Sequence, residues 1–185
     1  AFLAELIKTG IEGHDLDVYL DASNQLRMHR DIYPQEAPDY IEFYQYSPAY
    51  ALAFTPFLWL PLVATVIILS LLHVVAYGLL YWLWGRIFRR LGLSHAVEML
   101  IWALPIWLVF SQFWADLGYL NVYVLMALLA SLLIDAILEE RLGLSVLWLI
   151  TILQIKPQWA FAAAVPLLLR RYRFFFKLAI STAVS

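Results

Sequence analysis

Residues 62–84 form a nearly unbroken apolar run, which is followed by Arg86, Arg89 and Arg90. A helix needs about 20 apolar residues to cross the hydrocarbon core of a membrane, so this run predicts a transmembrane helix. Of the 185 residues, 64% are hydrophobic and only 14% are charged, whereas soluble domains carry roughly 25% charged residues. We therefore expect an all-α, polytopic bundle of transmembrane helices.

Composition also excludes several classes of function. The chain has no cysteine, which rules out a disulfide framework, cysteine metal sites and thiol catalysis. The sequence has no basic segment interleaved with aromatic residues, which is the pattern that would indicate a nucleic-acid partner. The net charge of −2 says little because the acidic and basic residues are segregated along the chain.

The distribution of basic residues predicts the topology. Spans are expected at 62–84, 96–112 and 119–138, and another starts from about residue 174. Lysine and arginine mark the cytoplasmic side, so the basic residues of 86–90 and 170–177 are expected inside. Segment 144–169 then starts and ends inside, and Lys156-Pro157-Gln158 interrupts it. This favours a re-entrant pair of half-helices over one kinked span that would put Arg170 outside.

The region before residue 61 is expected to face water on the opposite side. Residues 1–12 are interpreted as the tail of a preceding helix, 13–60 as an extracytoplasmic loop with short interfacial helices, and 61–185 as the bundle. We expect the chain to be part of a longer protein. The loop is acidic and contains only two arginines, Arg27 and Arg30. Its acids are Asp15, Asp17, Asp21, Asp31, Glu36, Asp39 and Glu42.

Asp15 and Asp17 are the first candidates for chemistry. Two carboxylates at this spacing can share a cation, or one can act as a base while the other is structural. The alternatives are a solvated loop or the N-cap of a helix that runs to about Met28. Lys156 is the second candidate, because an ammonium within the membrane usually marks a function or a charge pair. Its alternative is a lysine that reaches the headgroups.

Other polar residues have weaker signals. Gln112, Asp116, Gly118 and Asn121 lie at the outer end of the third predicted span, where helix capping explains them equally well. His73 lies in the middle of span 62–84, where it lines a cavity or, more simply, bonds to a neighbouring helix. Asp135 is expected to pair with Arg141 or to reach water. The loop tyrosines fit an interfacial belt or a surface on which a sugar stacks.

Five segments taken together resemble glycosyltransferase family 87, of the GT-C superfamily. Asp15-Leu16-Asp17-Val18-Tyr19 is similar to the family's opening motif, and Asp31-Ile32-Tyr33 follows it. Tyr44-Gln45-Tyr46-Ser47-Pro48, with prolines at 56 and 61, resembles the family's approach to the next span. Gly118-Tyr119-Leu120-Asn121 is similar to its G-Q-x-N motif, and Ile155-Lys156-Pro157-Gln158 with Arg170-Arg171 to its K-P-Q…R-R segment. Tyr119 replaces the family's Gln, and Ser47 replaces its first Pro.

The resemblance implies a multi-pass enzyme of GT-C fold in the bacterial cytoplasmic membrane. It would transfer a hexose, with mannose implied, from a polyprenyl-phosphate donor to a glycolipid or glycan acceptor on the outer face. The implied catalytic residues are Asp15 and Asp17. The implied substrate-binding residues are Tyr19, Tyr46, Asn121, Lys156 and Gln158. No cofactor is implied, although a divalent cation at Asp15 and Asp17 is left open.

The sequence is also compatible with two functions other than that of a glycosyltransferase. One is a non-catalytic, transferase-like subunit that packs against membrane-protein partners, which the replacement at Tyr119 favours. The other is a transporter or flippase for a polar lipid, because transporters also use broken helices with buried polar groups.

Overall fold

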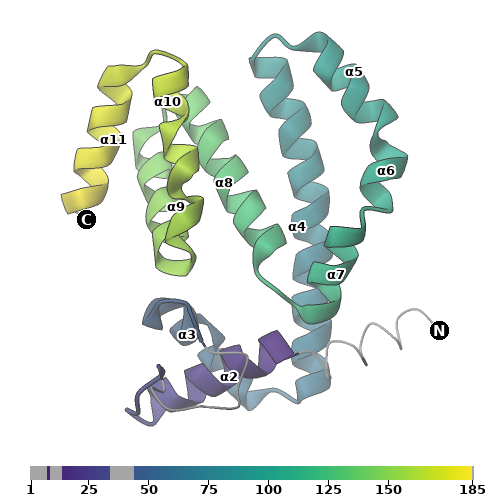
Figure 1. Cartoon of the computed structure of the whole chain (residues 1–185), viewed down its shortest axis with the longest axis vertical. Coiled ribbons are helices and arrows are strands. Elements are labelled where there is room, and N and C mark those ends of the chain that lie inside the picture. The colour runs from purple at the N-terminus through teal and green to yellow at the C-terminus, as the bar shows by residue number, and fades with distance from the viewer. Residues whose placement is uncertain (1–7, 9–13, 34–43, 185) are drawn as a thin grey trace. The chain divides into compact units, whose positions relative to one another are not determined.

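The computed structural model describes residue 8, residues 14–33 and residues 44–184. The described residues are helical with no strand (Figure 1), which confirms the all-α prediction. The predicted tail at 1–12 lies outside the described residues except for Lys8, as do the loop acids Glu36, Asp39 and Glu42. The chain forms two compact units, one of Ala1–Val75 with Ser111–Tyr123 and one of Ala76–Phe110 with Val124–Ser185.

The first unit packs the loop helices against each other. It contains α2 (His14–Arg27), α3 (Pro48–Phe54), the short 3-10 helix η1 (Thr55–Trp59), the first half of α4 (Leu62–Arg90) and α7 (Ser111–Tyr119). α3 lies against α2 in Figure 1. Ser47 caps α3, since its Oγ accepts from Tyr50 N at 3.4 Å, and Pro48 occupies the first turn, where a missing N–H costs nothing. Pro56 then marks the change to η1.

The second unit contains the rest of α4 and a helical hairpin. Its other elements are α5 (Ser94–Trp102), α6 (Leu104–Leu108), α8 (Tyr123–Leu138), α9 (Leu142–Ile155), η2 (Pro157–Ala164), α10 (Val165–Leu168) and α11 (Tyr172–Val184). The chain turns at Lys156, and η2 with α10 returns alongside α9 (Figure 1). Arg171 Nη1 donates to Leu138 O at 3.2 Å, which brings the end of the hairpin back to its start.

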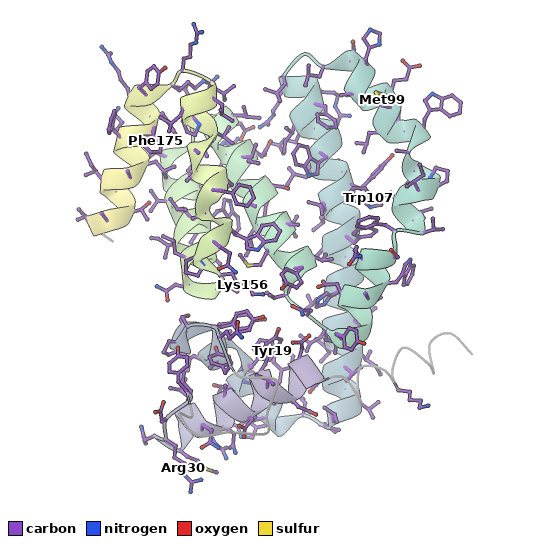
Figure 2. The ribbon with its side chains drawn as sticks, viewed as in Figure 1. Tyr19, Arg30, Met99, Trp107, Lys156 and Phe175 are labelled. Atoms are coloured by element: carbon purple, nitrogen blue, oxygen red, sulfur yellow. The ribbon has the colours of Figure 1, made fainter. Side chains whose placement is uncertain are left out.

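The predicted second span is broken in the structure. α5 ends at Trp102 and α6 begins at Leu104, with Pro105 in its first turn. Proline removes one helical hydrogen bond and disfavours helix in the residue before it. Tyrosine hydroxyls of α4 satisfy carbonyls near the breaks, since Tyr81 Oη donates to Leu100 O at 3.1 Å and Tyr77 Oη donates to Trp107 O. The Tyr77 and Trp107 rings stack at 4.8 Å, with Trp107 directed toward α4 (Figure 2).

α4 is the one helix among the described residues that is long and apolar enough to cross a membrane. Ser94–Trp102 and Leu104–Tyr119 meet the same criterion only when they are taken together, with a 55° bend between them. The helices at the third and fourth predicted spans are shorter, at Tyr123–Leu138 and Leu142–Ile155. α4 also exposes an apolar stripe of Leu71, Val75, Leu79 and Trp82, each at least 46% accessible, as expected of a helix that faces lipid.

Ion pairs gather where α4 ends near the end of α8. Arg90 Nη1 donates to Asp135 Oδ1 at 2.7 Å, and Arg86 Nη2 lies 3.3 Å from Asp135 Oδ2. Both arginines also contact Glu139, as does Arg141. Asp135, which is 7% exposed, therefore pairs with the arginines of α4 and neither with Arg141 nor with water as predicted, because the long side chains of Arg86 and Arg90 reach the last turn of α8.

Candidate functional site

The first turn of α2 carries the predicted catalytic acids. Asp15 and Asp17 lie at the N-terminal end of the helix, where the helix dipole stabilises negative charge. Leu16, Tyr19 and Ser23 are fully or almost fully buried, and their three- and four-residue spacing defines the inner face of α2. Asp15 is half-buried beside this face, while Asp17 is exposed. Residues two apart on a helix do not face each other, so this helix disfavours a cation bridged by the pair.

Asp15 is held by a residue far away in the sequence. Asn121 Nδ2 donates to Asp15 Oδ2 at 2.8 Å, and Asn121 Oδ1 accepts from Val122 N at 2.7 Å. Both polar atoms of the Asn121 side chain therefore contact the protein. This bond joins two of the residues predicted from the sequence, one from the acidic loop and one from the G-Y-L-N turn.

The turn that presents Asn121 is unusual in its sequence. α7 ends at Tyr119, and Leu120 adopts a left-handed conformation with φ of +52°. Asn121 N donates to Asp116 O at 2.9 Å and Leu120 N to Leu117 O at 3.4 Å, which is the Schellman pattern that usually has glycine at this position. Leu120 is 3% exposed, so its burial offsets the backbone strain and fixes the turn.

His73 connects this turn to the middle of α4. Its Nε2 lies 2.6 Å from Asn121 O and its Nδ1 lies 2.8 Å from Leu69 O. Carbonyl oxygens only accept, and an imidazole donates through at least one nitrogen, so the ring donates to at least one of these carbonyls. Asp116 Oδ2 lies 3.8 Å from Nε2. His73 is 2% exposed and Asp116 7%, so the pair is buried.

Asp116 also stabilises the start of the next helix, because its Oδ1 accepts from Tyr123 N at 3.2 Å. A cavity of about 240 Å³ opens beside this polar group. Its lining consists of Gln112, Ala115, Asp116, Tyr119, Asn121 and Tyr123. Tyr119 and Tyr123 are about half exposed, so the cavity combines aromatic surface with amide and carboxylate groups. Such a mixture suits a polyhydroxyl ligand, which stacks on rings and needs several hydrogen-bond partners.

Two predicted substrate residues lie in the aromatic core of the first unit. Tyr19 is 1% exposed and Tyr46 8%, their hydroxyls lie 3.1 Å apart, and both rings pack against Tyr50. Tyr19 extends from α2 toward this cluster (Figure 2). Burial, together with neighbouring tyrosines, raises the pKa of Tyr19 and of Tyr50 far above the ordinary tyrosine value. These hydroxyls therefore remain protonated and act as hydrogen-bonding groups, while contact with substrate stays a prediction.

Lys156 and Gln158 belong to the second unit. Lys156 is half-buried at the end of α9 (Figure 2), with an extended backbone that turns the chain, and Gln158 is exposed. The first unit therefore brings together Asp15 and Asn121 of the predicted residues. A cavity shared by Asp15 and Lys156 stays a prediction.

Comparison with known proteins assigns the chain to a family. The model of glycosyltransferase family 87 matches residues 44–185. The chain belongs to glycosyltransferase family 87. No curated protein and no solved structure matches it. Members of family 87 are membrane glycosyltransferases, and the apolar stripe of α4 agrees with that setting.

The family match divides the candidate site. Asn121, Lys156 and Gln158 lie within the matched residues, whereas Asp15, Asp17 and Tyr19 precede them. The Asn121–Asp15 bond thus links the matched region to the acidic helix. His73 and Asp116 were singled out separately, and their contact was not predicted. They meet where α4 contacts α7, and the turn at Leu120 adds Asn121 O to the same group; a leucine gives no signal for such a turn.

Proposed function

We propose that this member of family 87 transfers a hexose, with mannose as the leading candidate, from a polyprenyl-phosphate donor to a hydroxyl of a glycolipid or glycan. The bond from Asn121 to Asp15 carries the proposal, because it fixes an acid next to the polar turn of the family region. The proposed setting is a multi-pass protein of the bacterial cytoplasmic membrane, with residues 13–60 outside and the basic residues of 86–90 and 170–177 inside.

Asp15 is the proposed general base. Its carboxylate accepts the proton of the acceptor hydroxyl as that oxygen bonds to the anomeric carbon of the sugar. The bond from this carbon to the phosphate oxygen breaks, and the electron pair leaves with the polyprenyl phosphate. Attack from the opposite side inverts the anomeric configuration. Asn121 positions Asp15, because both polar atoms of its side chain are engaged within the protein.

Lys156 is the proposed partner of the departing phosphate. An ammonium at a helix break offers a point charge for the negative charge that grows on the leaving group. Gln158, on the same turn, is the proposed second contact, and Tyr19 and Tyr46, which contact each other at the inner face of α2, are the proposed further substrate-binding residues. The leaving group is a lipid monophosphate, so the reaction as proposed has no required metal.

Sugar transfer from synthetic polyprenyl-phosphate-mannose tests the assignment. Asp15→Asn should lower kcat by about 10²–10⁴-fold, the contribution of a well-placed general base. Asp21→Asn is the matched control, because Asp21 is an exposed acid of the same helix and the substitution removes the same charge. Circular dichroism checks that both variants fold. Full activity of Asp15→Asn, or equal loss in Asp21→Asn, would refute the base assignment.

The transfer assay also tests the divalent cation, and cysteine labelling tests the side of the membrane on which each segment lies. Equal loss in Asp15→Asn and Asp17→Asn, restored by Mg²⁺ or Mn²⁺, would replace the metal-free mechanism. Single cysteines at the exposed positions Asp31 and Tyr172 report topology in a chain without native cysteine. We expect an impermeant reagent to label position 31 from outside and position 172 only after the membrane is opened.

A further inference from the structure

The turn between α10 and α11 contains a second cavity, which the proposed transfer reaction does not use. Its volume is about 430 Å³, within the range of about 300–1,000 Å³ that is typical of small-molecule sites. The polar lining consists of Glu140, Arg170, Arg171, Arg173 and Lys177, together with Tyr172. Four cations and one carboxylate therefore surround it.

The single carboxylate is already engaged. Arg171 Nη1 lies 3.3 Å from Glu140 Oε1 and donates to Leu138 O at 3.2 Å, so the Arg171 side chain connects the hairpin to the end of α8. Within residues 44–184, no acid lies at ion-pair distance from Arg170, Arg173 or Lys177. Arg173 and Lys177 are four apart on α11, where like charges repel. The lining thus carries an excess of positive charge that an anion would relieve.

The backbone also directs positive potential toward the cavity. Arg170 adopts a left-handed conformation with φ of +56°, and Arg171 N donates to Pro166 O at 2.7 Å. This turn ends α10 and starts α11 directly afterwards, so the first amides of a 13-residue helix lie beside the arginines. Helix N-termini favour anions, which adds to the effect of the side chains.

Aromatic and apolar side chains lie on the elements that form the cavity. Tyr172 and Phe174 line it, and Tyr172 is 54% exposed. Phe176 of α11 and Leu168 of α10 are 61% and 82% exposed. A soluble anion would gain nothing from these side chains, whereas a lipid could place its phosphate among the cations and its chains against Tyr172 and its exposed apolar neighbours. Basic pockets beside transmembrane helices on the cytoplasmic side commonly hold anionic headgroups, and the positive-inside rule assigns this turn to that side.

We propose that the cavity formed by Arg170, Arg173 and Lys177 binds the phosphate of an anionic membrane lipid. The shared chemistry is a phosphate group, which an anionic phospholipid or free phosphate could supply, and the exposed Tyr172, Phe176 and Leu168 on the same elements favour the lipid. The site lies on α11 and its preceding turn. It is independent of Asp15 and of sugar transfer, so its failure would leave the proposed reaction untouched.

Thermal unfolding of the whole chain in neutral-detergent micelles tests the site. Dioctanoyl-phosphatidylglycerol, added in increasing mole fraction, should raise the unfolding temperature, whereas dioctanoyl-phosphatidylcholine and inorganic phosphate should have much smaller effects. Ligand that binds only the folded state raises stability with its concentration, so the series yields a dissociation constant. Each basic residue near a lipid surface contributes about 1 kcal/mol, or roughly fivefold in affinity.

Variants then locate the effect. Arg173→Gln should weaken phosphatidylglycerol binding about fivefold, and Arg173→Gln with Lys177→Gln about 25-fold, while Arg173→Lys keeps most of it. Arg89→Gln is the matched control, since Arg89 is an exposed arginine at the end of α4. An equal response to phosphatidylcholine, or equal loss in Arg89→Gln, would overturn the site. A full response to inorganic phosphate would overturn the lipid as its ligand.

Discussion

The buried pair of His73 and Asp116 allows a quantitative test of the polar network. The two side chains approach to 3.8 Å, and at an effective dielectric constant of about 20 an imidazolium and a carboxylate at that distance attract each other by about 4 kcal/mol. The free-energy cost of removing both groups from water offsets part of this attraction. We therefore expect a coupling free energy of about 1.5–3 kcal/mol in a double-mutant cycle of His73→Leu and Asp116→Asn, the upper part of the usual range for contacting residues.

The single variants set the scale for the cycle. His73→Leu removes the ring's contacts with Asn121 O and Leu69 O and the polar neighbour of the buried Asp116, which should cost about 3–5 kcal/mol of unfolding free energy. Asp116→Asn keeps an acceptor for Tyr123 N, so its effect isolates the charge. Unfolding by sodium dodecyl sulfate in mixed micelles, followed by tryptophan fluorescence, measures all four proteins.

The cycle distinguishes the two forms of the imidazole. A neutral ring makes no hydrogen bond to a carboxylate at 3.8 Å, so the two substitutions would then add to within about 0.5 kcal/mol. Additivity would refute a charged pair of His73 and Asp116. Leu69→Ala, which removes apolar volume one turn away but keeps its carbonyl, is the control for packing. It should destabilise the protein without changing the coupling.

Three further predictions concern other parts of the chain. His29 is exposed with φ of +55°, so His29→Gly should raise the unfolding free energy by roughly 1 kcal/mol, whereas Gln25→Gly within α2 should lower it by about the same amount; equal signs in the same denaturation assay would contradict this. Desolvation is the largest single influence on the pKa of Glu139 and raises it, but hydrogen bonds from Arg90 and Arg86 and the nearby positive charges together outweigh it and lower the pKa below 4.5. Its stabilising effect should therefore be full above pH 4.5 and fade below it, and Glu139→Gln should remove that part of the pH dependence of the unfolding midpoint. Lys156→Met should weaken donor binding more than acceptor binding in steady-state transfer kinetics, with partial recovery in Lys156→Arg because guanidinium is planar and bulkier; equal changes in both KM values would count against a phosphate contact.

The sequence was most informative where composition decides the structure. The apolar run at 62–84 predicted α4, and the prolines at 48 and 56 predicted short helices in its approach, because both signals are local. The break at Lys156 was also visible, since proline after lysine interrupts any helix there. The breaks at Ala103 and around Phe110 were missed, because a long apolar segment with one proline predicts a single span as readily as a bent pair.

The site was only partly predictable, for a different reason. Asp15 and Asn121 were both singled out, but a contact between residues 106 positions apart depends on how α2 and α7 pack. Tyr19 and Tyr46 were assigned to substrate because tyrosine suits both a sugar surface and a core. The burial of Tyr19 follows from the spacing of Leu16, Tyr19 and Ser23 on one face of α2, whereas that of Tyr46 depends on how its segment packs against this helix.

Asn121 has a double function that explains why one turn matters so much. Its carbonyl binds His73, in the middle of α4, and its side-chain amide binds Asp15, at the start of α2. The buried Leu120 holds the backbone between them in a conformation that a leucine rarely adopts. The position of the Asp15 carboxylate is therefore set by α4 and α7 as well as by its own helix. A general base needs this kind of support, because its effect depends on being held within hydrogen-bond reach of one proton.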